Sequence, residues 1–340
     1  MITIDGSFGE GGGQILRSSL ALSLVTGKPF SIERIRAGRK KPGLQRQHLT
    51  AVRAAAEVGQ AEVQGASLGS TRLTFVPREV RPGQYHFAIG TAGSTTLVVQ
   101  TVLPALLLAA EPSQLRLEGG THNMNAPPFD FLQKTFLPLL ARLGMHAEAR
   151  LERYGFYPAG GGRFTVEIRP PGELARLELL QRGPITGRAV QGLVSRLPLH
   201  IAQREARTVL DELDWPDQCA TVEQVEAHGP GNVVLIEVQS PEVTEVVVGF
   251  GQRGVPAETV ARGAAQEAAR YLACDVPVGP WLADQLLLPL ALARGGVFRT
   301  LEPSKHTQTN LETLKHFLEI QTAVEQVGDD VWEIRVEPGK

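Results

Sequence analysis

The chain has 340 residues, of which 42% are hydrophobic and 21% are charged, as is typical of a globular protein long enough for two domains or one elaborated domain. Its 34 Lys and Arg residues and 36 Asp and Glu residues give a net charge of −2. This balance argues against a protein that coats long stretches of nucleic acid, because such a protein needs many phosphate contacts. Binding of a single nucleic-acid terminus stays compatible with it.

Cysteine usage and apolar patterning limit the class of protein further. Cys219 and Cys274 lie in no C-x-x-C pair, so we expect two reduced packing thiols rather than a zinc or disulfide scaffold. The opening MITIDGSFGE is acidic and rich in turn formers, unlike a signal peptide. The longest apolar stretch, 96–110, is interrupted by a glutamine and a proline and predicts a buried helix rather than a membrane span. We therefore expect a cytoplasmic protein without membrane contact.

The first part of the chain predicts a small helix-and-strand unit. Glycines open an apolar helix, and a short strand, a polar loop, a second helix and two further short strands follow. In this order, the elements are expected at 11–27, 29–36, 37–43, 44–59, 61–64 and 71–76.

The same order of elements recurs twice. The second copy is expected at 92–110, 113–119, 120–128, 129–144, 147–152 and 163–168, and the third at 279–295, 297–301, 302–310, 311–320, 322–327 and 331–336. Three copies that share one core would cover the apolar helix faces that a single copy leaves exposed. We therefore predict an α/β (α+β) fold of three tandem repeats of a two-helix, four-stranded unit. The loops 37–43, 120–128 and 302–310 should then lie near one another.

A segment with a pattern of its own interrupts the third copy. Its strands are expected at 185–195, 233–240 and 244–251, and its helices at 198–213 and 256–272. We predict that 183–276 forms a smaller inserted α/β domain, and that 1–182 and 277–340 together form a large domain of three repeats.

The segment GEGGGQILR, at 9–17, places consecutive glycines before a helix. Such a turn exposes backbone N–H groups and the positive end of the helix dipole, which suits phosphate. Glu10 could hold a divalent cation between phosphates, and Arg17 lies further along in the helix. The pattern matches neither the P-loop nor the dinucleotide fingerprint, and taken alone it favours a tight turn with a helix start.

The segment 34–48 is strongly basic within a slightly acidic chain. Arginine pairs suit bidentate binding of phosphate, and the run falls in one of the three equivalent loops, which favours an anion site over a solvated face. Its basic residues are Arg34, Arg36, Arg39, Lys40, Lys41 and Arg46. The second loop, GTHNMNAPP, carries His122, for which we keep a structural role.

His306 lies in the third loop, EPSKHTQTN, before a helical pattern. A helix N-terminus disfavours the imidazolium and leaves a neutral, nucleophilic ring nitrogen; the alternative is an exposed loop histidine. The chain contains neither an H-x-x-x-H pair nor a Cys/His cluster that would complete a metal site. Trp281, Asp284 and Gln285 open a helix and, taken singly, are ordinary core or helix-start residues.

Seven segments together resemble the RNA 3′-terminal phosphate cyclases, and the likeness runs essentially end to end. They are GEGGGQILRSSLALS, IRAGRKKPGLQRQHLTAV, FAIGTAGSTTLVVQTVLPAL, GGTHNMNAPPFDF, GFYPAGGG, LADQLLLPLAL and HTQTN. The resemblance implies three units like the C-terminal domain of a bacterial translation initiation factor, with a smaller inserted domain. It also implies an ATP- and metal-dependent enzyme that acts on an RNA 3′-phosphate end. A histidine would take AMP from ATP, the AMP would pass to the RNA phosphate, and the ribose 2′-OH would expel it to leave a 2′,3′-cyclic phosphate.

The same resemblance assigns the site residues and the large domain as the catalytic one. It implies His306 as the nucleophile and Glu10 as the metal-binding acid. The residues implied to bind phosphate or the RNA end are Arg17, Arg36, Arg39 and Gln47, and those implied to bind ATP are Gln100, Pro127, Trp281, Leu282, Ala283, Asp284 and Gln285. Two positions depart from the family pattern. Trp281 stands where a tyrosine is expected, which keeps a stacking ring but loses the hydroxyl. Lys305 replaces a small residue and could contact phosphate or lower the pKa of His306.

Other functions fit parts of the pattern. Non-catalytic relatives that act in ribosome assembly lack the nucleophilic histidine, which this chain keeps. Enolpyruvyl transferases also use repeated α/β units and basic anion sites, but their motifs are absent here. An anion-binding scaffold would bind ATP without turnover. The RNA substrate, the preferred metal and the oligomeric state stay open.

Overall fold

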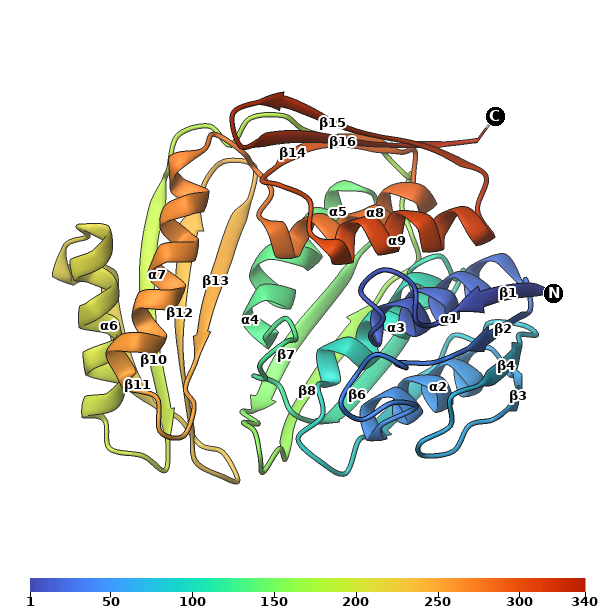
Figure 1. Ribbon diagram of the computed structural model, residues 1–340, viewed down its shortest axis with the longest axis horizontal. Helices are drawn as coiled ribbons and strands as arrows, with labels where there is room; N and C mark the ends of the chain where they lie inside the picture. The colour runs from blue at the N-terminus through green and yellow to red at the C-terminus, as the bar shows by residue number, and fades with distance from the viewer. Residues whose placement is uncertain (340) are drawn as a thin grey trace.

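The computed structural model describes residues 1–339 and begins with a four-stranded sheet and two helices (Figure 1). The elements are β1 (Ile2–Asp5), α1 (Gln14–Thr26), β2 (Phe30–Glu33), α2 (Arg46–Val58), β3 (Glu62–Gln64) and β4 (Leu73–Val76). The strand order is β1-β2-β4-β3; β1 and β2 are parallel, and the other neighbours are antiparallel.

The second unit repeats this arrangement. Its elements are β5 (Gln84–Ala88), α3 (Thr95–Leu107), β6 (Ser113–Gly119), α4 (Phe129–Phe131), the π-helix η1 (Leu132–Phe136), α5 (Leu137–Arg142), β7 (Ala147–Arg153) and β8 (Gly162–Ile168). The strand order is β5-β6-β8-β7, again with the first pair parallel and the others antiparallel. The segment that corresponds to α2 is a helix with a π turn in its middle.

The third unit has the same topology, although its first strand is far from the others in sequence. Its elements are β9 (Leu177–Leu179), α8 (Pro280–Leu292), β14 (Gly296–Thr300), α9 (Lys305–Phe317), β15 (Ile320–Gly328) and β16 (Val331–Pro338). The order is β9-β14-β16-β15, with β9 and β14 parallel. Three sheets therefore share one strand order and one pattern of strand directions, as tandem units would.

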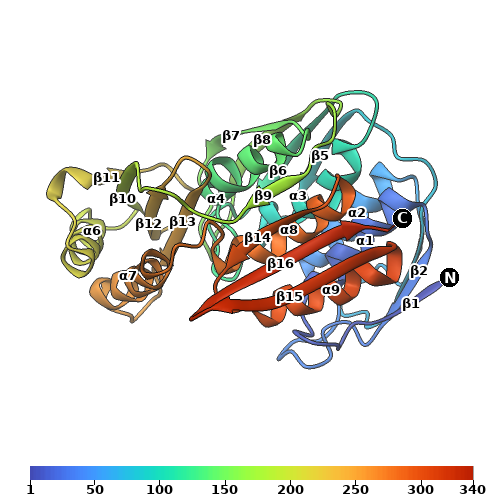
Figure 2. The same ribbon diagram turned by 90° about the horizontal axis from the view of Figure 1, so that it is seen from above.

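The helices of the three units pack against one another, and the sheets cover them from outside (Figures 1 and 2). Helix α1 contacts both α3 and α9, and α8 contacts α9. Leu20, Leu106 and Leu286, one from each unit, are completely buried in a single apolar cluster. Burial of leucine side chains on this scale supplies the main driving force for association of the units.

Local sequence explains where key helices begin and end. Helix α3 starts after Ser94, whose hydroxyl accepts a hydrogen bond from the backbone N–H of Leu97, as an N-cap serine does. Helix α1 ends at Gly27, which adopts a left-handed conformation with φ of 67°; glycine reaches this region without steric cost.

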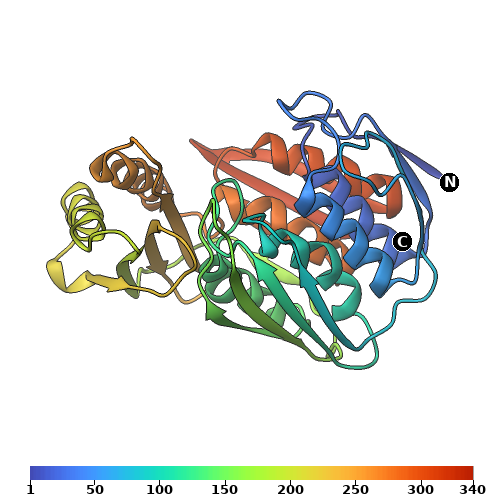
Figure 3. The ribbon, with the colours of Figure 1, turned by 90° about the horizontal axis from the view of Figure 1, so that it is seen from below.

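A fourth sheet lies to one side of the three units (Figure 3). Its elements are β10 (Gly187–Ser195), α6 (His200–Leu213), the short 3₁₀ helix η2 (Asp217–Cys219), β11 (Ala220–Gln224), β12 (Gly231–Gln239), β13 (Thr244–Phe250) and α7 (Ala257–Ala273). The order β11-β10-β12-β13 differs from that of the other sheets. A separate apolar cluster that includes Val209, Ile236 and Ala265 forms its core. We refer to these elements as the inserted unit; the domain boundaries at 183 and 276 stay predictions.

The mixed α/β fold class is confirmed, and the predicted helices and strands lie within a few residues of their expected bounds, except for α9, which begins six residues before the expected start at 311. The stretch 96–110 contributes to α3, most of which is buried, as expected. Strands β1, β5, β9 and β11 were not predicted. Cys219 and Cys274 are free and half-buried. Within residues 1–339, no helix combines the length and the apolar character needed to cross a membrane.

Candidate active site

The glycine turn before α1 brings Glu10 against the start of α9. Gly9 has φ of 56°, and a side chain on it would lie 2.1 Å from Thr309 Oγ1. A side chain on Gly12 would lie 2.2 Å from a carboxylate oxygen of Glu10. The backbone N–H of Glu10 donates to Thr309 Oγ1 at 3.0 Å. Glycine at residue 9 permits the left-handed backbone and the close approach to α9, and glycine at residue 12 leaves room for the Glu10 carboxylate in its present position.

His306 lies in the first turn of α9, not in a loop. The prediction of a loop at 302–310 is wrong because Ser304 caps the helix: its hydroxyl accepts the backbone N–H of Thr307 at 3.2 Å, and α9 begins at Lys305. Thr309 donates to the carbonyl of Lys305 at 2.6 Å. The histidine is therefore fixed on a helix rather than on a flexible segment, and its side chain is 39% exposed.

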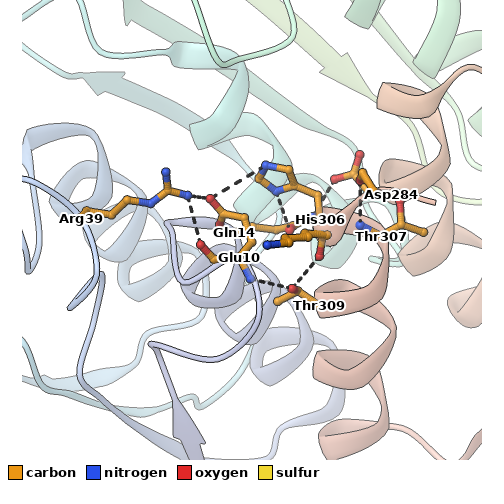
Figure 4. Close-up of polar contacts among 9 residues, drawn as sticks. Glu10, Gln14, Arg39, Asp284, His306, Thr307 and Thr309 are labelled. Atoms are coloured by element: carbon orange, nitrogen blue, oxygen red, sulfur yellow. Dashed lines mark hydrogen bonds and ion pairs between the residues drawn. The ribbon is translucent and has the colours of Figure 1, made fainter. Parts of the chain in front are cut away.

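Gln14 determines which ring nitrogen of His306 carries the proton (Figure 4). Its amide Nε2 donates to Asp284 Oδ2 at 2.6 Å, so its Oε1 is the atom that faces His306 Nδ1, at 3.0 Å. Because an amide oxygen only accepts, Nδ1 carries the hydrogen and Nε2 keeps its lone pair. Nε2 lies 3.9 Å from Glu10 Oε1, beyond hydrogen-bond distance.

The surroundings of His306 favour its neutral form. Burial lowers the pKa of His306 below 6.5, and the positive charges of Arg17 and Arg39 lower it further. The exposed Lys305 is not among the causes of this shift. At neutral pH the ring is therefore an uncharged imidazole with one free nitrogen.

Glu10 combines an ion pair with an unsatisfied oxygen. Arg39 pairs with Glu10 Oε1 and also donates to the Glu10 backbone carbonyl at 3.2 Å (Figure 4). The other oxygen, Oε2, is buried and has no hydrogen-bond partner among the described residues. A buried carboxylate oxygen without a partner fits a cation ligand. Residues 1–339 contain no group of three or more acidic, histidine or cysteine side chains that could hold a metal ion.

Two polar groups flank this centre, the half-buried Asp284 and the buried His48. Burial raises the pKa of Asp284 to about 7, against the opposing effect of Arg17. Burial, Arg17 and Arg36 lower the pKa of His48 to about 3, so this ring is neutral. Its Nδ1 accepts the backbone N–H of Gln45 at 3.2 Å and closes the capping box of α2.

A cleft opens beside His306 between α1, α3, α8 and α9. Its polar lining includes Gln14, Arg17, Gln100, Asp284, Gln285 and Asn310, and apolar side chains, mainly of α3 and α8, form much of the rest. Gln100 donates to Gln285 at 2.6 Å. Four of the predicted residues therefore line one cleft, and Gln14 connects it to the histidine.

The remaining predicted residues occupy other positions. Arg36 donates to the carbonyls of residues 41 and 43, at 2.6 and 3.0 Å, and so shapes its own loop. Gln47 accepts the backbone N–H of residue 94 at 3.0 Å, and the carbonyl of Pro127 accepts the hydroxyl of residue 96 at 2.7 Å. The side chains of Leu282 and Ala283 are buried in the core, whereas the neighbouring residue 281 is 53% exposed. Thus the basic loop and α9 meet at residue 10, and the 120–128 loop packs on the start of α3.

Gln14 and Thr309 are site residues that the sequence pattern did not indicate. Both are polar side chains on helices, both are almost completely buried, and each has its hydrogen-bond partner in another part of the chain. The one available signal was the position of Gln14 as the first residue of a helix that follows a glycine-rich turn. No spacing rule identifies its partner, because the contact joins the two ends of the chain.

The fold is a set of repeated α/β units. Near the starts of α1 and α9, the site brings together a neutral histidine, an acid with an unsatisfied oxygen, and arginines. This set of groups is suited to chemistry on phosphate. A profile of the RNA 3′-terminal phosphate cyclase family matches residues 8–324. A protein of this name from Koribacter versatilis is 53% identical over 327 residues, which cover 96% of this chain and 92% of the relative. The namesake from Ralstonia nicotianae is 50% identical, over 96% and 94% of the two chains. That from Ectopseudomonas mendocina is 47% identical, over 99% and 98%. The chain belongs to the RNA 3′-terminal phosphate cyclase family, a family of enzymes.

Proposed function

We propose that this chain converts an RNA 3′-terminal phosphate to a 2′,3′-cyclic phosphate at the expense of ATP, through a covalent adenylate on His306. The family assignment supports the cyclase activity. The observation that carries the histidine step is the hydrogen bond from Nδ1 to Gln14, which leaves Nε2 unprotonated and unengaged beside Glu10.

In the first step, Nε2 of His306 attacks the α-phosphorus of ATP. The new N–P bond replaces the bond to pyrophosphate, which leaves with its electron pair. The Nδ1–H bond to Gln14 stabilises the positive charge that develops on the ring. Arg39 and Arg17 are placed to offset the phosphate charge, since both act electrostatically on this histidine.

In the second step, an oxygen of the RNA 3′-phosphate attacks the adenylyl phosphorus and displaces His306, which regains its lone pair. In the third, the ribose 2′-OH attacks the RNA phosphorus and gives its proton to solvent, the bond to AMP breaks, and AMP leaves with the electron pair while the cyclic phosphate forms. We propose that Arg36, Arg39 and Gln47 bind the RNA phosphate. A small basic pocket is sufficient for a single terminus, in keeping with a net charge of −2.

We propose ATP and a divalent cation such as Mg²⁺ or Mn²⁺ as the required small molecules. Glu10 would hold the cation through the oxygen that has no protein partner, and the cation would neutralise phosphate charge. Trp281 and Pro127 would pack on the adenine, and Gln100, Asp284, Gln285 and the backbone of 282–283 would line the nucleotide site. A reaction on RNA that uses ATP is also in keeping with a cytoplasmic location.

Mass spectrometry of the intact protein tests the central step. After incubation with ATP and Mg²⁺, the chain should gain the mass of one AMP, and His306→Ala should gain none. Full labelling of the His306→Ala variant would place the adduct elsewhere and overturn the proposed nucleophile. Conversion of a 3′-phosphorylated RNA to a phosphatase-resistant end tests the overall reaction. Binding of ATP without an adduct or a cyclic product would favour the non-catalytic alternative.

A further inference from the structure

Trp281 combines an exposed ring with a fixed edge. The residue is 53% exposed at the start of α8, yet its indole N–H donates to the carboxylate of Glu267 on α7. An exposed tryptophan N–H can be satisfied by water, so a carboxylate is not needed for this purpose. A charge-assisted hydrogen bond instead restricts the orientation of the ring.

Glu267 belongs to the inserted unit, whereas Trp281 belongs to the third repeat. Burial raises the pKa of Glu267, and the hydrogen bond from Trp281 opposes that shift. The carboxylate is thus partly withdrawn from water, where a hydrogen bond to it is stronger than on the surface.

Two further contacts fix the segment between Glu267 and Trp281. The hydroxyl of Tyr271 donates to the carbonyl of Pro277 at 3.1 Å. Glu245, which is 2% exposed, accepts the backbone N–H of Gly279 at 3.0 Å. The inserted unit therefore holds the start of α8 at three points, and the last of them is the indole itself.

The other side of Trp281 leads into the cleft. Its backbone carbonyl accepts the side-chain amide of Gln285 at 3.0 Å, and Gln285 accepts from Gln100 at 2.6 Å. Gln100 and Gln285 both line the cleft beside His306. A continuous set of hydrogen bonds thus joins α7 of the inserted unit to the cleft through Trp281.

We propose that Glu267 is a positioning residue of the nucleotide site, which holds the indole plane of Trp281 so that a purine base can stack on its exposed face. The inserted unit then contributes to nucleotide recognition although none of its residues lines the cleft. This inference rests on the proposed function, in which Trp281 packs on the adenine. Stacking depends on ring orientation, so loss of the restraint weakens binding of the base without affecting binding of the phosphates.

The test uses the full chain with His306→Ala, which prevents turnover, and measures binding of Mg²⁺-ATP by calorimetry. Glu267→Ala should weaken ATP binding by about 3- to 10-fold, and Glu267→Gln, which keeps an acceptor, should restore most of it. Tripolyphosphate has no base, so its affinity should be the same in all variants. Glu258→Ala, which removes an exposed carboxylate on the same helix that pairs with Arg204, is the matched control and should bind ATP normally.

A double-mutant cycle tests whether Glu267 acts through the indole. Trp281→Phe keeps an aromatic face but lacks the N–H, so Glu267→Ala should cause no further loss in this background. Unchanged ATP binding in Glu267→Ala, or an equal loss for tripolyphosphate, would overturn the inference. The proposed function fails separately, if the chain with His306 intact forms no AMP adduct. Thermal unfolding identifies any variant that does not fold. If Glu267→Ala does not fold, the ATP affinity of Glu267→Gln, compared with that of Trp281→Phe, tests the inference instead.

Discussion

One histidine precedes the second helix of the second unit and another lies in the first turn of the second helix of the third unit, and their surroundings differ. His122, in the 120–128 loop of the second unit, is 1% exposed, and both ring nitrogens are engaged, by Thr121 Oγ1 and by Asp130 Oδ2, each at 2.8 Å. The rings of Tyr154 and Phe156 cover it. His306, at the start of α9, has one engaged nitrogen and one free nitrogen that faces an acid.

This difference separates a structural histidine from a reactive one. A ring with both nitrogens hydrogen-bonded has no lone pair to offer without breaking a buried contact, which costs free energy. A ring with Nδ1 held and Nε2 free is oriented and still nucleophilic. The structural role expected for His122 agrees with its contacts.

The largest expected effect separates the two histidines directly. His306→Ala should reduce formation of the AMP adduct by about 10³-fold or more, because the attacking atom is removed. His122→Ala should lower the thermal midpoint, yet its folded fraction should still form the adduct. Intact-mass measurement after ATP treatment, together with thermal unfolding, checks both. Loss of the adduct in folded His122→Ala would contradict a purely structural role for His122.

The next effect concerns the partner of His122. Asp130→Ala should lower the free energy of unfolding by about 3 kcal/mol, because it leaves a buried histidine and part of the charge of Lys134 without a partner. Glu312→Ala, which breaks an exposed ion pair with Lys315, should cost no more than about 0.5 kcal/mol. Urea denaturation measures both variants. Equal, small losses would mean that the His122 network contributes little.

The contribution of Asp130 to the free energy of unfolding should also depend on pH. Burial alone would raise the pKa of Asp130, but the hydrogen bond from His122 and the charge of Lys134 lower it below 3.8. A carboxylate with a lowered pKa in the folded state stabilises the protein above the unfolded pKa, and the stabilisation is lost as pH falls through the folded pKa. The stability difference between the wild type and Asp130→Ala should therefore be constant above about pH 5 and shrink in stronger acid.

A smaller effect is expected from the residue that orients His306. Gln14→Leu removes the acceptor for Nδ1–H and frees the ring to rotate, so adduct formation should slow by about 10- to 100-fold. The KM for ATP should change much less. Gln266→Leu, an exposed position on α7, is the control and should be neutral. Single-turnover kinetics with labelled ATP gives both quantities, and an unaltered rate in Gln14→Leu would remove the argument for a fixed tautomer.

The smallest effect is a pH dependence. Only neutral His306 can attack, and its pKa is lowered by burial, Arg17 and Arg39. The adenylylation rate should therefore be half-maximal at a pH below 6.5, and should fall by about tenfold per pH unit in stronger acid. Rates of adduct formation from pH 5 to 8 provide the measurement. A midpoint above 6.5 would contradict the lowered pKa.

Sequence reasoning recovered most of the fold because its signals are local. The long amphipathic and apolar helices and the strands that follow them carry clear periodicity. Strands β1, β5 and β9, the first of each sheet, are only three to five residues long, and each pairs with a strand beyond a helix. Strand β11 is mostly polar or exposed at the edge of its sheet. Short strands of this kind are defined by their partners rather than by their own pattern.

For the candidate site, residue types were easier to predict than contacts. Glu10, Arg39 and His306 were named together through the family resemblance, and the structure brings them together. The start of α9 was misplaced although Ser304 is a recognisable N-cap. The roles of Gln14 and Glu267 depend on side chains that meet across distant parts of the chain, so no local pattern could have indicated them.

The inserted unit also bears on how the third sheet assembles. Strands β9 and β14 are hydrogen-bonded neighbours, although the whole inserted unit lies between them in sequence. Closing a longer loop carries a larger entropic cost, which rises by about 0.6 kcal/mol for each doubling of its length. Arg182, just before the insertion, donates to the carbonyls of Tyr271 and Leu272 at its far end, at 2.8 and 3.3 Å. Once the inserted unit has folded, this clamp joins its two ends, and the chain between β9 and β14 behaves as a short connection. Formation of the inserted unit before the third sheet would thus remove most of the contact-order penalty for the repeat that carries His306.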